Sequence, residues 1–200
     1  MIRSDREVKD PVLIDAMLSQ FSTMVLSLNG EDGHPYSVPM NFGYEMDDKN
    51  LRVYVHFTKR GKKVDLMHRD PRCTLQFHSF LDFPDSPYKR HRHDYRRMTA
   101  KGSMEILDPA NRLEEFRHAH EVLMHCNARE MEPRHTSSVP NMYMGRIVCP
   151  LHQVRAKSEF PLNKPEDVPY RNLCQPAQPS FPAGKTNKLY PSDRQGIAGS

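Results

Sequence analysis

The chain has 200 residues, a formal net charge of +4, 37% hydrophobic residues and a mean hydropathy of -0.76. This length suffices for one domain with its own core, and so small an excess of positive charge does not require a nucleic-acid partner. The first residues are charged, without the apolar run of about 7–15 residues that a secretory signal needs, and no stretch approaches the roughly 20 apolar residues of a membrane span. We therefore expect a cytoplasmic protein that binds neither membrane nor nucleic acid.

The first half of the chain predicts one helix followed by two hairpins. Asp10–Phe21 begins with Asp-Pro and has apolar residues at a helical spacing, so we expect a helix capped by Asp10. Strands are expected at Thr23–Leu28, Tyr36–Tyr44 and Leu51–Phe57, because these β-type runs are separated by turn-forming residues. Pro39 cannot donate a hydrogen bond to a sheet, which predicts an edge or a bulge at that position.

The second half predicts two helices and three more strands. The helices are expected at Lys63–His68 and at about Ala110–Cys126, and the strands at Arg72–Phe80, Tyr95–Leu107 and Asn141–Ala156. Six strands with few helices indicate a mainly β (α+β) fold, an antiparallel six-stranded β-barrel with flanking helices.

A change of composition near Lys157 divides the chain in two. Residues 1–157 are expected to form the barrel domain. In residues 158–200 prolines recur and polar residues dominate. Such a segment cannot form a core of its own, so it either packs on the barrel or is disordered.

The segment Thr58–Lys63 is a basic turn, Thr-Lys-Arg-Gly-Lys-Lys, between an expected strand and an expected helix. A helix N-terminus exposes unpaired N–H groups at the positive end of the helix dipole, and Lys and Arg add charge-assisted hydrogen bonds to phosphate oxygens. A phosphate-binding turn and a merely solvated basic turn both fit this composition.

Four short motifs follow one another in an order that resembles a known family. They are Gly33–Pro39 (Gly-His-Pro-Tyr-Ser-Val-Pro), Tyr54–His56 (Tyr-Val-His), Gly61–Leu66 (Gly-Lys-Lys-Val-Asp-Leu) and Asp70–Cys73 (Asp-Pro-Arg-Cys). Together they resemble the FMN-binding split-barrel superfamily of the pyridoxamine 5'-phosphate oxidases, and most of all its nitroimidazole-reductase-like branch. The resemblance covers about residues 3–157. It implies a split β-barrel that binds FMN at the interface of a homodimer.

The resemblance also implies which residues bind the cofactor. They are Val38, Pro39, Met40, Asn41, His56, Phe57, Thr58, Arg60, Lys62 and Lys63. Lys62 and Lys63 are the main candidates for the phosphate, whereas Lys59 is expected to be solvated. His56 is the candidate catalytic residue, although a half-buried strand histidine bonded to backbone fits equally well. Arg96 and Arg97 depart from the family pattern and would either contact an anion or lie on the surface.

The function implied by the resemblance is that of an FMN-dependent oxidoreductase acting on a small electron-poor molecule, such as a nitroaromatic compound. NAD(P)H would bind only transiently, since the chain has no Rossmann fingerprint. The chain contains no Trp, in contrast to true pyridoxamine phosphate oxidases, which argues against pyridoxamine phosphate as substrate. The alternative is a non-catalytic carrier or sensor that binds flavin, F420 or haem.

The remaining polar clusters predict no metal site. The candidate histidines lack the spacing of a zinc motif and are expected on the surface; they are His91, His93, His118, His120 and His125. The basic loop Lys89–Arg97 is expected to form a mobile lid over the flavin. The four cysteines are scattered, so we expect free thiols.

Overall fold

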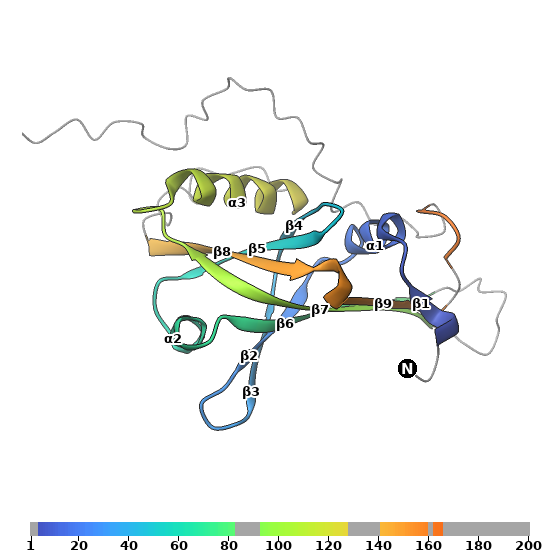
Figure 1. Ribbon diagram of the computed structural model, residues 1–200, viewed down its shortest axis with the longest axis horizontal. Helices are drawn as coiled ribbons and strands as arrows, with labels where there is room; N and C mark the ends of the chain where they lie inside the picture. The colour runs from blue at the N-terminus through green and yellow to red at the C-terminus, as the bar shows by residue number, and fades with distance from the viewer. Residues whose placement is uncertain (1–3, 83–92, 128–140, 160–161, 166–200) are drawn as a thin grey trace, which may run out of the picture.

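The computed structural model describes residues 4–82, 93–127, 141–159 and 162–165, which form one curved sheet and three α-helices (Figure 1). The helices are α1 (Pro11–Leu18), α2 (Lys62–Arg69) and α3 (Leu113–Cys126), with 3₁₀ turns at Ser4–Arg6 and Leu151–Gln153. The strands are β1 (Glu7–Val8), β2 (Met24–Asn29), β3 (Pro35–Met40), β4 (Gly43–Met46), β5 (Asn50–Thr58), β6 (Arg72–Asp82), β7 (His93–Leu107), β8 (Met142–Pro150) and β9 (Val154–Ser158).

The sheet is antiparallel and curls back on itself without closing. Its main path runs β3-β2-β6-β7-β8-β5-β4, and β9 joins β7 to β1 at the side. The strands at the two ends of this path, β3 and β4, are separated in sequence only by Asn41 and Phe42. Two residues span only a few ångströms, so the ends of the sheet must lie close together. No pairing between β3 and β4 joins them in the described residues, which is the arrangement of a split barrel.

The core fills the inside of this curved sheet. Alternate residues of the central strands are completely buried there, among them Leu26, Val53, Leu75, Met98 and Ile147, whereas the edge strand β3 has no buried residue. Alternation places the intervening side chains on the outer surface of the sheet. Each strand therefore has a barrel-facing side and an outward side.

The expected number of strands was wrong, because the sheet has nine strands and not six. The expected strand Tyr36–Tyr44 is two strands, β3 and β4, broken where the chain crosses from one end of the sheet to the other. The expected strand Asn141–Ala156 is also two, since Leu151–Gln153 makes a turn of 3₁₀ helix between β8 and β9. The ninth strand, β1, has only two residues, too few for a periodic pattern. The mainly antiparallel α+β class and the edge position of Pro39 are confirmed.

The three expected helices are present within a few residues of their predicted ends. Asp10 caps α1 as expected, with its side chain accepting a hydrogen bond from the backbone N–H of Val12. Helix α3 packs on the outward side of β4, β5 and β8. Gly43 allows this close approach, because a Cβ atom there would lie 2.7 Å from the Cα of Leu123. No helix in the described residues has both the length and the apolar character that a bilayer crossing requires.

Several expectations lie partly or wholly outside the described residues. Of the basic loop Lys89–Arg97, residues 89–92 lie outside the described residues, whereas residues 93–97 are not loop but the start of β7. The proline-rich extension lies mostly in residues 166–200. Cys73, Cys126 and Cys149 form no disulfide, as expected, and all three are buried, whereas Cys174 falls in the extension.

Candidate cofactor-binding site

The end of β5 separates two neighbouring candidate residues. Phe57 is buried on the barrel-facing side, and its ring centroid lies 6.2 Å from that of Tyr143 on β8. His56 is exposed and has the same orientation along the strand as Tyr54, whose ring contacts His118 of α3. Adjacent residues of a strand point to opposite faces. His56 therefore points away from Phe57, to the side of the sheet where α3 lies.

The basic turn that follows β5 leads directly into α2. The Thr58 hydroxyl donates a hydrogen bond to the carbonyl of Arg60 at 2.9 Å, which holds the turn. Gly61 has φ 119°, a conformation that favours glycine, and it is the N-cap residue of α2. No side chain caps this helix start. The turn thus presents the first N–H groups of α2 without a capping carboxylate or hydroxyl.

Lys62 and Lys63 occupy the first turn of α2 and lie against aromatic rings. The Lys62 ammonium is 5.9 Å from the ring centroid of Tyr36 on β3, and the Lys63 ammonium is 5.7 Å from that of Phe57. These cation–π contacts direct the two lysines to the gap between β3 and the end of β5. The two residues expected to hold a phosphate are therefore brought together at the opening of the split barrel.

The electrostatics of this turn favour an anion. Neither Lys62 nor Lys63 forms an ion pair within the part of the chain that the structure describes. Burial lowers the pKa of Lys63 from its ordinary value, so its positive charge is partly desolvated. A desolvated ammonium beside the positive end of a helix is unfavourable until an anion neutralises it.

Lys59 behaves differently from its neighbours, and the expectation that it is solvated was wrong. Its ammonium lies 3.2 Å from a carboxylate oxygen of Asp108 and 5.1 Å from the ring centroid of Tyr143. Only about 30% of its side chain is exposed. Asp108 follows β7, far away in sequence, so the turn alone gave no signal of this pairing. Lys59 has a counterion of its own and belongs to the scaffold of the turn.

Strand β3 supplies the other wall of the candidate site. Val38 and Met40 are half-buried against the core, whereas Pro39 is exposed on the outward side. Asn41 follows the strand and is half-buried. In the described residues β3 pairs only with β2. Its second edge can therefore offer backbone N–H and C=O groups to a planar ligand.

The arginine pair on β7 is divided between the inside and the outside of the protein. Arg96 is buried, with 2% exposure, and one of its Nη atoms donates a hydrogen bond to the side-chain oxygen of Gln20 at 2.7 Å. Arg97 is exposed and lies over the Tyr95 ring at 5.9 Å. Of the two arginines, only Arg97 is accessible to a large anionic ligand.

Five histidines were expected on the surface; His91 and the side chain of His93 lie outside the described residues, and the expectation was wrong for His120. That side chain is 5% exposed and stacks on Phe116. His118 is exposed but bonded to Glu45, with 3.0 Å between Nε2 and Oε1. In the described residues no three side chains of His, Cys, Asp or Glu gather as metal ligands.

Sequence reasoning thus identified the turn and Phe57 but missed the ring of Tyr36 beneath Lys62. Lys62, Lys63 and Phe57 meet at the barrel opening, Thr58 and Arg60 form the turn, and His56 points elsewhere. Tyr36 was assigned to a strand without a role. Its contact with Lys62 depends on the packing of α2 beside β2 and β3, which no spacing in the sequence reveals.

Comparison with known proteins identifies the family of the chain. The family model for pyridoxamine 5'-phosphate oxidase matches residues 13–139, which is more than half of the chain. No curated protein matches the chain. A candidate 5-nitroimidazole antibiotic resistance protein from Bacteroides thetaiotaomicron has a similar structure, with a TM-score of 0.58 at 23% identity, and the match covers 76% of this chain and 86% of that one.

Two further solved structures are similar at comparable levels. An FAD-binding protein from Mesorhizobium loti gives a TM-score of 0.52 at 24% identity, covering 78% of this chain and 98% of that one. An FAD- and haem-binding protein from Mycobacterium smegmatis gives a TM-score of 0.52 at 17% identity, and the match covers 98% of this chain and 94% of that one. At these identities the likeness shows the fold alone.

The open antiparallel sheet and the family match together define a split-barrel protein. The chain belongs to the pyridoxamine 5'-phosphate oxidase family.

Proposed function

We propose that this protein is an FMN-dependent oxidoreductase whose cofactor phosphate is bound at the start of α2. The observation that supports this most directly is the pair Lys62 and Lys63 in the first turn of a helix that has no side-chain cap. Two cations at the positive end of a helix dipole oppose folding unless they serve a ligand. A phosphate would satisfy the lysines and the free N–H groups at once.

The rest of the site suits the remainder of a flavin. Lys62 lies against Tyr36 of β3, so a flavin whose phosphate is held at α2 would extend along β3, where the unpaired edge at Val38–Asn41 can offer backbone groups to the ring. When bound, the flavin supplies the electron transfer, and the protein supplies binding, orientation and access. Thr58 and Arg60 would fix the shape of the turn that receives the phosphate.

For His56 we propose a contact with substrate and not with the phosphate; since it faces the other side of the sheet from Phe57, that substrate would be one bound at the flavin site of a partner subunit. Its side chain points away from Phe57 and Lys63, so one phosphate cannot touch all three. The substrate class that we propose is a small electron-poor organic molecule reduced with electrons from NAD(P)H. The similarity in fold to a candidate nitroimidazole resistance protein supports this choice.

We further propose that the protein is a homodimer in which the partner subunit completes each flavin site. In the described residues the second edge of β3 has no strand beside it, and a planar cofactor bound along that edge needs a second wall. A second copy of the chain would supply that wall and exclude water from the flavin. Dimerisation that strengthens when FMN is added, measured by sedimentation, would support this arrangement.

A second candidate function is that of a non-catalytic flavin, F420 or haem carrier. The similarity in fold to an FAD- and haem-binding protein supports this carrier function as the alternative. The two functions differ in turnover. An enzyme bleaches its bound flavin when NAD(P)H is added and recovers the colour when a nitro compound is added, whereas a carrier does not complete this cycle.

The phosphate site is tested by replacing both lysines, Lys62→Ala with Lys63→Ala. We expect the dissociation constant for FMN to rise about 100-fold or more, because two charge-assisted hydrogen bonds are lost. Binding of riboflavin, which lacks the phosphate, should hardly change. Lys49→Ala in the turn before β5 is the matched control, since Lys49 is an exposed lysine far from α2. Equal FMN affinity in the double variant and the control would show that the phosphate is bound elsewhere.

A further inference from the structure

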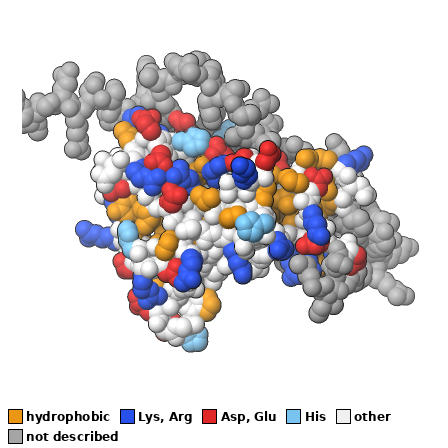
Figure 2. Space-filling model, in the orientation of Figure 1, with side chains coloured by type: hydrophobic (Ala, Val, Ile, Leu, Met, Phe, Trp, Pro, Cys, Tyr) orange, Lys and Arg blue, Asp and Glu red, His pale blue; other side chains and the backbone are white. Residues whose placement is uncertain are grey.

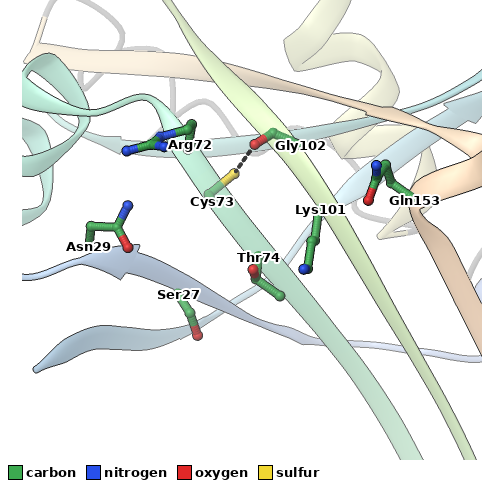
Figure 3. Close-up of a pocket in the computed structure, with 8 residues that line it drawn as sticks. All are labelled: Ser27, Asn29, Arg72, Cys73, Thr74, Lys101, Gly102 and Gln153. Atoms are coloured by element: carbon green, nitrogen blue, oxygen red, sulfur yellow. Dashed lines mark hydrogen bonds between the residues drawn. The ribbon is translucent and has the colours of Figure 1, made fainter. Parts of the chain in front are cut away.

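A pocket of about 450 Å³ lies on the outward side of the sheet, apart from the basic turn (Figure 3). It is lined by Ser27 and Asn29 of β2, Arg72, Cys73 and Thr74 of β6, Lys101 and Gly102 of β7, and Gln153 of the 3₁₀ turn before β9. Its volume is within the range of small-molecule sites. Nothing in the proposed flavin site uses these residues.

The floor of the pocket is a row of polar side chains across three strands. Ser27 pairs with Thr74, and Thr74 pairs with Lys101, so their side chains share one side of the sheet. Figure 3 shows the Lys101 side chain descending from β7 toward Thr74. The Ser27 hydroxyl also lies 2.9 Å from that of Ser37 on β3. The sheet therefore presents hydroxyl groups and one ammonium group together at its surface.

Arg72 forms the rim and is held in place although 79% of its side chain is exposed. Its backbone N–H, Nε and one Nη atom all donate to Asp70, at 3.1, 2.9 and 2.7 Å. Asn29 donates to the same carboxylate at 2.7 Å. The hydrogen bonds from Arg72, and then that from Asn29, hold the pKa of Asp70 well below its usual range. An exposed arginine fixed in this way is pre-organised and still has an Nη group that Asp70 does not occupy.

The charges around the pocket favour an anionic ligand. Arg72 and Lys101 are cations, and Asp70 is the carboxylate at the rim, already occupied by Arg72 and Asn29. Lys101 forms no ion pair with any residue of the described chain. Ser27, Thr74 and Gln153 are neutral groups that can donate hydrogen bonds. A negatively charged group would find an unneutralised ammonium, an arginine edge and hydroxyl donors in one place.

We propose that this pocket binds a small organic anion whose carboxylate or phosphate oxygens lie between Lys101 and Arg72. It is a different site from the basic turn. Helix α2 has eight residues and is therefore about 12 Å long. Its first turn contains Lys62, whereas the residue after its last turn is Asp70, which holds Arg72. The two sites are at opposite ends of this helix.

The test uses the full chain and succinate as a probe, with succinamide as its neutral counterpart of the same shape. Titration followed by amide NMR should give saturable shifts at Thr74 and Lys101 with succinate and none with succinamide. If the site recognises oxyanions in general, inorganic phosphate should produce shifts at the same amides. If the site prefers carboxylates, only succinate should produce them. Equal binding of succinamide would overturn the proposal, because the charge would then play no role.

Variants distinguish succinate binding in this pocket from binding to other basic residues. Lys101→Met should raise the dissociation constant for succinate about tenfold or more, since a charge-assisted hydrogen bond is lost. Arg155→Gln is the control, because Arg155 is exposed on β9 and does not line the pocket. The double replacement of Lys62 and Lys63 should leave succinate binding unchanged. Unchanged affinity in a folded Lys101→Met protein, or loss only in the α2 variant, would refute the site.

Discussion

Helices α2 and α3 begin in opposite ways, although neither has a side-chain N-cap. The first turn of α3 contains Glu114 and Glu115, which complement the positive end of its dipole. The first turn of α2 contains Lys62 and Lys63, which oppose it, and a single acidic residue, Asp65, which offsets them only in part. Where two helices in one protein differ in this way, the helix whose first-turn charges oppose its dipole is the better candidate for a ligand site. Its charges do not stabilise the fold, so another role must account for them.

The surroundings of the two helices reinforce this contrast. Arg146 of β8 lies 2.6 Å from Glu105 and 2.9 Å from Glu115, and Arg112 also bonds both glutamates. Acidic and basic side chains lie side by side over this part of the surface (Figure 2). The charges at the start of α3 are thus neutralised within the protein. Lys62 and Lys63 at the start of α2 form no ion pair in the described residues and can bind an anionic ligand.

A substitution at the contact between α3 and the sheet should cause the largest loss of stability. In Gly43→Ala the added Cβ atom would meet the Leu123 backbone at 2.7–2.9 Å, and that backbone cannot rotate away. We expect a loss of about 1–3 kcal/mol in the free energy of unfolding, measured in urea. FMN affinity should stay the same, since α3 lies on the other side of β5 from Lys63.

Gly33→Asn is the control for this prediction. Gly33 has φ 80° and open space around its Cα, and asparagine tolerates this conformation. We expect little change in stability. A Gly43→Ala protein as stable as the control would mean that α3 does not pack on β4 as described.

The two regions also differ in how far the sequence could reveal them. The helical spacing in Leu113–Cys126 predicts a buried face, and the structure buries Phe116, Ala119, Val122 and Leu123. The basic turn could be recognised because its residues are contiguous. What contiguous residues cannot show is which strands face one another. The Lys59–Asp108 pair, the ring of Tyr36 under Lys62 and the Ser27–Thr74–Lys101 row all depend on register between strands distant in sequence.

Removing one first-turn charge from each helix should change stability in opposite ways. In Glu114→Met, α3 loses a favourable interaction with its dipole and the exposed ion pair with Arg117 at 2.8 Å, and we expect a loss of about 0.3–1 kcal/mol in the free energy of unfolding. In Lys62→Met the removal of an unfavourable charge offsets the weak cation–π contact with Tyr36, so stability should change by less than about 0.5 kcal/mol. FMN affinity should fall in Lys62→Met and remain constant in Glu114→Met. A larger loss of stability in Lys62→Met than in Glu114→Met would contradict the inference that the first-turn charge opposes the dipole in α2 and complements it in α3.

The smallest expected effect concerns the pH dependence of α3 docking through His118. The groups that face this histidine are Glu45 of β4, Tyr54 of β5, Arg146 of β8 and Glu121 of α3. The hydrogen bond to Glu45 raises the pKa of His118 above 6.5, against the opposing effect of burial. Burial opposes ionisation of Glu45, but hydrogen bonds from His118 and Tyr54 outweigh it and lower the pKa of Glu45 below 4.5.

The sign of the effect follows from these two shifts. The contribution of His118 is complete below about pH 6.5 and is lost as the pH rises through its raised pKa, and that of Glu45 is complete above about pH 4.5 and is lost as the pH falls through its lowered pKa. The pair therefore stabilises α3 docking most between these values. Because the His118 side chain is 46% exposed, the contribution should be only about 0.5 kcal/mol. His118→Gln should reduce the difference in unfolding free energy between about pH 5.5 and about pH 8.5 by that amount, whereas His125→Gln, an exposed change on the same helix, should not. If both variants keep the full pH dependence of the parent protein, the contact between His118 and Glu45 does not contribute to the docking of α3.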